Sequence, residues 1–302
     1  MSFGPEDGAR GGASGGPSDE GLSPRTAPAE EERRERSVAR PERRLVLLVA
    51  GLLLLALVIG VFLLRLLYGD RAGGTSVFED SIESGTEPVV RLTSGLGRVD
   101  VEGVEGLDSV EISAKRYARG SSSAAAKENA AAVPVNVDNE DSALEISSDE
   151  GRGTGVDYDL RVPRGSTVEV ESTAGDVEIS GLNNAATVRA ESGDISLENV
   201  RGSVTIEAPR GDVAIESTGT ETGRAEITVG SGDLDLKDLI FGLLESQVEA
   251  GDVTLSGRFS GSGSVFVETG SINVQLPPED TRELDLQTRV GEIVRDDEQK
   301  SG

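Results

Sequence analysis

Apolar and polar residues alternate in short runs along the second half of the chain. Each run lies directly before or directly after one of a series of glycines, and mostly polar residues separate its apolar members. The apolar residues before the glycines are Val168/Val170, Val188/Ala190, Val204/Ile206, Ile227/Val229, Val265/Val267 and Leu284/Leu286, and those after them are Val177/Ile179, Ile195/Leu197, Val213/Ile215, Leu234/Leu236, Val253/Leu255 and Ile272/Val274. A period of two with one apolar face predicts β-strands that turn one side inward.

The glycines between these runs recur at a nearly constant interval. They are Gly175, Gly193, Gly211, Gly232, Gly251, Gly270 and Gly291, with spacings of 18, 18, 21, 19, 19 and 21 residues. A period of about twenty is typical of repeat proteins, in which each unit buries its apolar face by stacking on the next. Two short strands per period, joined by glycine turns, predict an all-β solenoid. Seven coils stacked about 4.8 Å apart give a rod segment of roughly 29 Å.

An aspartate follows most of these glycines. Glycine tolerates the positive φ of a tight turn, and an aspartate carboxylate accepts hydrogen bonds from turn N–H groups. If the coils stack in register, these aspartates form a ladder along one edge: Asp176, Asp194, Asp212, Asp233 and Asp252. We interpret them as turn residues. The alternative is a Ca²⁺-binding ladder, although the dense Gly-Gly-x-Gly-x-Asp pattern of calcium-binding solenoids is missing, and no other cofactor is expected.

The part of the chain before residue 168 is less regular. The stretch VVRLTSGLGRVDVEGVEGLDSVEISAKRY predicts strands, and SGLGRVDV within it is a degenerate first copy of the repeat. Residues 121–133 are rich in alanine and predict a short helix. Strands resume at ALEIS and again at VDYDLRVPRG, where apolar residues alternate once more.

The stretch VDYDLRVPRGSTVEVESTAGDVEISGL, followed by serial Gly-Asp turns, resembles a known bacterial family. This is the β-strand-repeat family labelled "putative adhesin", an envelope domain of unknown function. The entry strand LRVPRG, residues 160–165, and the repeated Gly-Asp/Asn-Ile/Val turns carry the resemblance. It covers roughly residues 88–294 and implies a single-stranded β-helix-like fold at the cell surface. It implies no catalytic residues.

The N-terminal part of the chain has a different composition. Residues 1–44 contain hardly any large apolar side chain and predict a disordered tail. Residues 45–64 carry no charge, and twenty residues at about 1.5 Å each span roughly 30 Å, the thickness of a bilayer core. With Arg65 and Tyr68 at the membrane interface, residues 45–68 predict one transmembrane helix. The alternative, a cleaved signal peptide, is disfavoured by the long preceding tail and the length of the apolar run.

Basic residues flank the apolar run unequally. Arg33, Arg34, Arg36, Arg40, Arg43 and Arg44 precede it, whereas only Arg65 and Arg71 lie near its other end. The positive-inside rule therefore predicts a cytoplasmic tail and an extracytoplasmic remainder in the cell membrane. We interpret the arginine cluster as a topology signal that touches anionic headgroups rather than as a specific site. The remainder comprises a linker at 69–87, the β-repeat domain at 88–296 and a disordered end at 297–302.

Charge and composition exclude several classes of function. The net charge is −26, which repels nucleic acid. The chain has no Cys and no His, so disulfides, thiolate zinc sites, cysteine nucleophiles and Ser-His-Asp chemistry are absent. Carboxylate-only chemistry remains, but carbohydrate enzymes usually offer aromatic platforms, and the chain has no Trp. We therefore expect no enzyme.

The stretch DLIFGLLES, residues 238–246, departs from the polar turns of the other coils. Its apolar residues are Leu239, Ile240, Phe241, Leu243 and Leu244. One interpretation is a local cap or a wider piece of core. The other is an exposed apolar patch that docks a partner or the membrane.

Together these features predict a single-pass membrane protein that exposes an adhesin-like, non-enzymatic solenoid for binding or display. Its ligand would be a protein or glycan of the cell surface or envelope. The alternative is a regulatory or sensing protein of the envelope that acts through a membrane partner.

Overall fold

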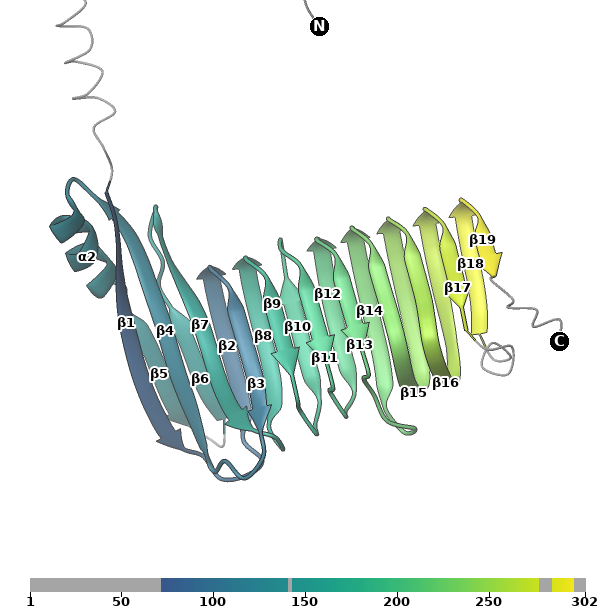
Figure 1. The fold of residues 1–302 in the computed structure, drawn as a ribbon, viewed down its shortest axis with the longest axis horizontal. Coiled ribbons are helices and arrows are strands. Elements are labelled where there is room, and N and C mark those ends of the chain that lie inside the picture. The colour runs from purple at the N-terminus through teal and green to yellow at the C-terminus, as the bar shows by residue number, and fades with distance from the viewer. Residues whose placement is uncertain (1–71, 141–142, 277–283, 296–302) are drawn as a thin grey trace, which may run out of the picture. The chain divides into compact units, whose positions relative to one another are not determined.

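The computed structural model describes residues 72–140, 143–276 and 284–295 and shows a β-solenoid (Figure 1). Strands that precede the glycine turns form one parallel row, here called the leading row, and strands that follow them form the trailing row. The leading row contains β2 (Val89–Leu96), β8 (Thr167–Ala174), β10 (Ala186–Ala190), β12 (Val204–Arg210), β14 (Arg224–Ser231) and β18 (Leu284–Val290). The trailing row contains β3 (Val99–Val104), β9 (Val177–Ser180), β11 (Ile195–Glu198), β13 (Val213–Glu216), β17 (Ile272–Gln275) and β19 (Ile293–Arg295).

Two long strands belong to both rows. They are β15 (Leu234–Ala250) and β16 (Val253–Thr269). The first part of β15 pairs with β13, and its last part pairs with β14. The β15–β16 pairing shifts register after residue 237 and again after residue 240, where the chain passes from one row to the other. The predicted solenoid is confirmed, including the degenerate first copy, because Gly97 takes the same positive φ as the other turn glycines.

Spatial order departs from chain order at the N-terminal end. Here β6 (Ala143–Ser148) pairs with β2, and β7 (Thr154–Pro163) pairs with β3, both in parallel. The other sides of β2 and β3 pair with β8 and β9. The β2–β3 coil therefore lies between two coils that follow it in the sequence.

Antiparallel strands and one helix cover this end, and together they form the N-terminal cap. It consists of β1 (Ala72–Glu83), β4 (Ser109–Gly120), β5 (Val135–Glu140) and α2 (Ser123–Ala131). β5 pairs with β6, β4 pairs with β7, and β1 pairs with β4. The change from parallel to antiparallel pairing ends the solenoid on this side.

The alanine-rich stretch forms the predicted short helix, α2, which packs closely against the cap strands. A Cβ at Gly74 would lie 2.3 Å from the backbone nitrogen of Lys127, so only glycine allows this approach. The Ser122 Oγ accepts a hydrogen bond from the first turn of the helix at 3.2 Å. At the other end, Arg116 donates to the carbonyl oxygen of Ala131 at 3.0 Å, which satisfies a free helix carbonyl.

The domain begins earlier than the boundary predicted from the sequence. Strand β1 lies inside the predicted linker 69–87, yet it pairs with β4 along its whole length. Its residues AGGTSVFEDSIE show little apolar alternation, and one face of the strand is covered only in part. Pairing with a distant strand, rather than local sequence, makes this segment part of the domain.

One continuous hydrophobic core fills the space between the two rows. Val213 and Ile215 are each 1% exposed, and Glu216 points to solvent, as the alternation predicts. No helix within the described ranges is long and apolar enough to cross a bilayer. The predicted tail at 1–44, the predicted helix at 45–68 and the predicted end at 297–302 lie outside those ranges.

Candidate functional site

The five aspartates that follow the turn glycines stack in register, one per coil. Each carboxylate accepts a hydrogen bond from the backbone N–H at the same position of the next coil. The bonds run from Asp194 N to Asp176 Oδ1 at 3.0 Å, Asp212 N to Asp194 Oδ1 at 2.9 Å, Asp233 N to Asp212 Oδ1 at 2.8 Å, Asp252 N to Asp233 Oδ1 at 2.8 Å and Ser271 N to Asp252 Oδ1 at 2.7 Å. The ladder therefore ties neighbouring coils together at their turns.

The ladder has a further member that sequence reasoning missed. Asp157 accepts a hydrogen bond from the backbone nitrogen of Arg98 at 3.2 Å, although no Gly-Asp pair marks its coil. Arg98 occupies the aspartate position of the β2–β3 coil, and its guanidinium pairs with Glu178 and, at 3.5 Å, with Asp100. One cation thus interrupts the column of acids. The signal in the sequence that could have revealed Asp157 is its place between the apolar residues Val156 and Tyr158.

Asp212 offers a test of whether the ladder stabilises the fold through hydrogen bonds or through charge. We expect Asp212→Ala to lower the free energy of unfolding by about 1 kcal/mol, because the N–H of Asp233 loses its acceptor. Asp212→Asn keeps an oxygen acceptor and removes one of a series of like charges. It should be neutral or slightly stabilising in urea melts. Equal losses for both variants would contradict a hydrogen-bonding role.

Calcium binding to the ladder stays a prediction. Among the described residues, no three acidic side chains come together in a way that could hold a metal ion. A cation could therefore bind the ladder only by bridging two neighbouring carboxylates, which lie about 4.8 Å apart. Such bridging would relieve a repulsion of roughly 1 kcal/mol per pair in a water-like dielectric.

Thermal melting can test this bridging. We expect millimolar Ca²⁺ to raise the melting temperature more than NaCl of equal ionic strength does. Changing all five ladder aspartates to Asn should abolish the difference while leaving the hydrogen-bond acceptors in place. A calcium shift no larger than the NaCl shift would leave the aspartates as turn residues only.

Ion pairs link most cations to acids on adjacent coils. Arg189 lies between Glu171 at 3.7 Å and Glu207 at 3.3 Å, and Lys237 contacts Glu216 at 2.5 Å. The pKa of Lys237 is raised by this hydrogen bond and by the charge of Glu216. Exposed pairs of this kind contribute little to stability. Because these ion pairs neutralise the cations, the charge that remains on the surface of the solenoid is predominantly negative.

Burial raises the pKa of two further groups. Burial raises the pKa of the Asp100 carboxyl above its usual value, the charge of Glu178 raises it further, and Arg98 opposes both. Burial also raises the pKa of the Tyr158 phenol to about 12, so this group stays neutral. Both lie near the β2–β3 coil, where the acid ladder is interrupted.

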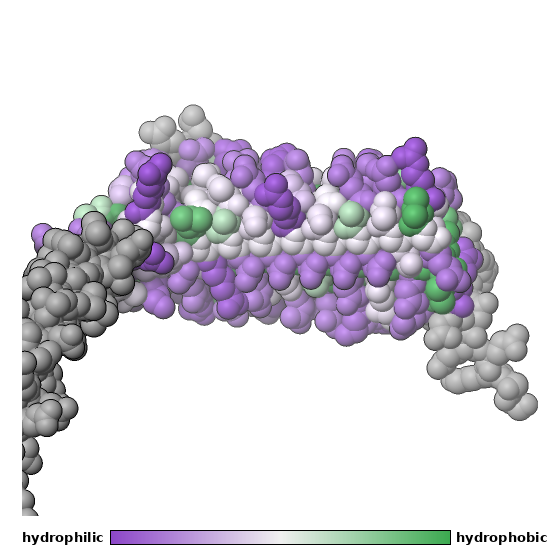
Figure 2. Space-filling model, turned by 90° about the horizontal axis from the view of Figure 1, so that it is seen from above, coloured by the Kyte–Doolittle hydropathy of each residue, from purple (hydrophilic) through white to green (hydrophobic). Residues whose placement is uncertain are grey.

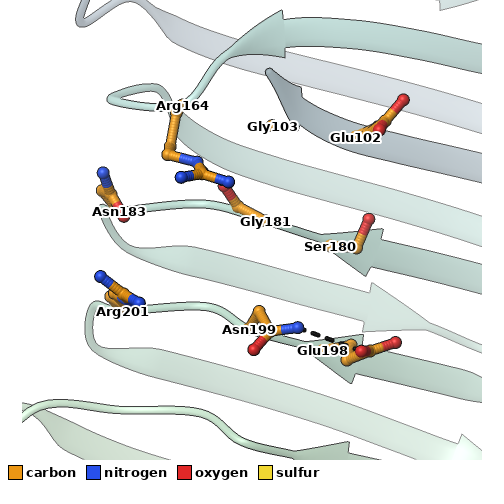
Figure 3. A pocket seen from close by; sticks show the side chains of 9 residues that line it. All are labelled: Glu102, Gly103, Arg164, Ser180, Gly181, Asn183, Glu198, Asn199 and Arg201. Carbon is orange, nitrogen blue, oxygen red and sulfur yellow. Dashed lines mark hydrogen bonds between the residues drawn. The ribbon is translucent and has the colours of Figure 1, made fainter. Parts of the chain in front are cut away.

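A polar hollow of about 360 Å³ lies where the trailing row turns toward the next coil (Figure 3). Its lining includes a column of donors from successive turns: Arg164, Asn183 and Arg201. Acids from neighbouring strands, Glu102 and Glu198, line it as well. Hydrophilic residues also cover most of the face that Figure 2 shows.

Glycine shapes this hollow. A Cβ at Gly103 would lie 2.5 Å from the carbonyl oxygen of Gly181, so the two turns can stack only without side chains. The Nε of Arg164 donates to that same oxygen at 3.1 Å. The Nδ2 of Asn199 donates to Glu198 at 3.0 Å (Figure 3). Arg201 forms no ion pair with any described residue, which leaves its guanidinium free for a ligand.

The hollow can bind polar groups through donors and acceptors on different sides. Its ionisable groups are carboxylates and guanidiniums, since the chain has neither His nor Cys. Ser180 is the one hydroxyl in the lining, and the acids of the lining are Glu102 and Glu198. Donors, acceptors and charges of both signs in one hollow suit recognition of a polar ligand.

The apolar segment at 238–246 lies in β15 and is largely part of the core. Leu239, Phe241 and Leu244 are between 0% and 2% exposed. Leu243 is half-buried, and Ile240 is 40% exposed. The five residues thus do not form one surface patch, because three of them are buried in the core. A contact through this segment would rely on Ile240 and Leu243.

The family model described as Toastrack DUF4097 matches residues 92–301. A putative adhesin of known structure from Bacteroides fragilis is 16% identical, with a TM-score of 0.42, over 73% of this chain and 97% of that chain. A putative adhesin from Parabacteroides merdae is 12% identical, with a TM-score of 0.35, over 73% and 96%. No curated protein gives a significant match. The family match covers the solenoid from β2 onward.

Proposed function

The chain belongs to the Toastrack DUF4097 family, and from this premise we propose that it is a membrane-anchored, surface-exposed β-solenoid that binds or displays without catalysis. The observation that carries the proposal is the direction of the chain along the solenoid. Strand β1, the first described element, lies in the N-terminal cap, and β18 and β19 lie at the opposite end of the solenoid (Figure 1). An anchor before β1 would leave the other end of the rod free to reach a partner.

The membrane part of the proposal is supported by the sequence. Residues 45–68 would cross the cell membrane once, with residues 1–44 in the cytoplasm and the solenoid outside. The support is the uncharged run at 45–64 and the six arginines before it. The acidic solenoid would then face outward, away from anionic headgroups.

Protease treatment of intact cells tests this topology. We expect protease to remove a tag at the C-terminus and to spare a tag at the N-terminus, because only the part after residue 68 would be accessible. Permeabilised cells provide the control, in which both tags should be lost. A C-terminal tag that is protected in intact cells would reverse the proposed orientation.

The partner class follows from the exposed chemistry of the solenoid. The polar hollow at Arg164, Asn183 and Arg201 offers hydrogen-bond donors, with acids close by. These groups suit a polar ligand, such as a surface glycan or an envelope protein. Binding of the purified protein to envelope fractions, compared with an Arg201→Ala variant, measures this directly. Equal binding by both proteins would remove the hollow from the proposal.

A second candidate function is regulation of the envelope through a membrane partner. The arginine-rich tail before the apolar run favours it, because a display module needs no such extended cytoplasmic segment. A pull-down with the full-length chain and with a chain lacking residues 1–44 separates the two. A binding module should keep its ligand without the tail, whereas a regulator should lose its partner.

A further inference from the structure

The end of the solenoid opposite the N-terminal cap has two unpaired strand edges. Strand β18 pairs only with β16, and β19 pairs only with β17, among the residues that the structure describes. We call β18 and β19 the C-terminal tip. A free strand edge presents a row of N–H and C=O groups that can pair with another chain.

Exposed apolar side chains concentrate at the same end. Val290 is 61% exposed, Val294 is 44% exposed and Ile293 is 36% exposed. Figure 2 shows hydrophobic residues gathering at this end of the rod, while the rest of that face is mostly hydrophilic. At the opposite end, the N-terminal cap covers the coils with antiparallel strands and a helix, and its outer strands β1 and β5 each pair on one side only among the described residues. The tip therefore has the chemistry of an interface.

The sequence of β18 is complementary to itself in the antiparallel direction. Its seven residues are Leu284, Asp285, Leu286, Gln287, Thr288, Arg289 and Val290. When two copies pair antiparallel with Gln287 opposite Gln287, Asp285 of each copy faces Arg289 of the other. Leu284 then faces Val290. Opposite charges and apolar residues directly across an antiparallel pair are stabilising.

This pairing would repeat a pattern that the solenoid already uses between its coils. Arg91 lies between Glu145 and Glu169, and Arg189 lies between Glu171 and Glu207, with one acid on each neighbouring coil. Among the described residues, Arg289 has an acid on one side only, Glu268 at 2.6 Å, and its side chain is 69% exposed. A second copy would supply Asp285 as the missing acid.

We propose that the C-terminal tip binds the C-terminal tip of a second copy of this chain by antiparallel pairing of β18 with β18. The segment after residue 295 is the competing occupant. Its sequence, DDEQKSG, contains no apolar side chain that could cover Val290, Ile293 and Val294. The exposed apolar residues favour the second copy, because the acids of this segment could pair with Arg289 but none of its side chains could cover an apolar surface.

Tip-to-tip pairing places the two N-terminal caps at opposite ends of the pair. If the chain is anchored before β1, which rests on the proposed function, such pairs would join two cell surfaces. Because a single C-terminal tip offers a small contact area, strong attachment between two cells would come from many such pairs acting together. The contact itself does not depend on anchoring and can be tested with purified protein.

Charge reversal tests the pairing register. The full-length chain in detergent should self-associate in sedimentation experiments. Asp285→Arg and Arg289→Asp, each alone, should weaken association about tenfold, because like charges then face each other at two symmetric positions. An equimolar mixture of the two variants should regain wild-type association, because Arg then faces Asp at both positions. A mixture as weak as the single variants, or a monomeric wild type, overturns the proposal.

Disulfide formation gives a second, independent readout. The chain has no Cys, so Gln287→Cys can cross-link only to another copy. Antiparallel partners lie about 4.5–5.5 Å apart at Cα, within the range for a disulfide. Gln247→Cys is the matched control, since it lies in the same outward column two coils away. Cross-linking of both variants at equal rates overturns the register. If only deletion of residues 296–302 produces association, that segment covers the tip and the proposal fails.

The outcome of these experiments leaves the proposed anchoring and display untouched. A chain that stays monomeric in solution would still be compatible with a solenoid that protease can reach on intact cells. Conversely, a protected C-terminus in the topology experiment would remove the role between cells without affecting association in solution. The two failures are therefore distinguishable.

Discussion

Ile215→Asp should unfold the coils around β13, at a cost of about 4 kcal/mol or more in the free energy of unfolding. Ile215 is 1% exposed and lies in the core between the two rows. Losing a buried isoleucine costs about 1.5–3 kcal/mol, and an unpaired buried carboxylate adds further to that cost. Because each coil is stabilised by its neighbours, the loss should spread along the rod. Urea melting followed by circular dichroism measures the change.

The matched control is Ala214→Asp, which places the same carboxylate one residue earlier on the opposite face. Ala214 is exposed, so the variant should lose at most about 1 kcal/mol through repulsion from Asp235, its neighbour in register. Glu216→Lys, the control suggested by sequence alone, is less suitable. It removes the ion pair with Lys237 and places two ammonium groups side by side. Similar losses for Ile215→Asp and Ala214→Asp would mean that the assigned faces are wrong.

Gly211→Ala should be the second most damaging substitution, with an expected loss of about 3 kcal/mol or more. Gly211 has a φ of 131°, which side chains rarely adopt. In addition, a Cβ there would lie 2.0 Å from the carbonyl oxygen of Gly193 on the adjacent coil. Backbone atoms cannot move aside as a flexible side chain can, so the coils must separate. Thermal melting should show a large drop in the transition temperature.

Gly106→Ala separates the effect of stacking from the effect of backbone conformation. Gly106 also has a positive φ, of 77°, but nothing lies within 4 Å of a Cβ placed there. This variant should lose only about 1 kcal/mol, from backbone strain alone. If both alanine variants melt at the same temperature, close stacking of the glycine turns is not what holds the coils together.

Much of the repeat could be predicted because its determinants are local. Alternation around Val213 and Ile215 specifies which face is buried, and a glycine every 18–21 residues places the turns. The register of the aspartate ladder follows from the same spacing. Its chemistry does not, because the acceptor role of Asp212 depends on the backbone nitrogen of Asp233 in the next coil. Sequence reasoning also missed Arg201 and the polar hollow, since their neighbours come from separate turns.

The sequence by itself determined the solenoid class, the inward faces of its strands and the positions of its turns. Tertiary structure alone decided that the β2–β3 coil stacks between β6–β7 and β8–β9, and that β1 joins the domain. It also turned Leu239, Phe241 and Leu244 inward and left the C-terminal tip without a pairing strand among the described residues. The physical reason is the distance along the chain over which each interaction acts. Side-chain alternation and glycine conformation act within a few residues. The stacking order of the coils and the covering of the solenoid's ends depend on hydrogen bonds between strands far apart in the chain.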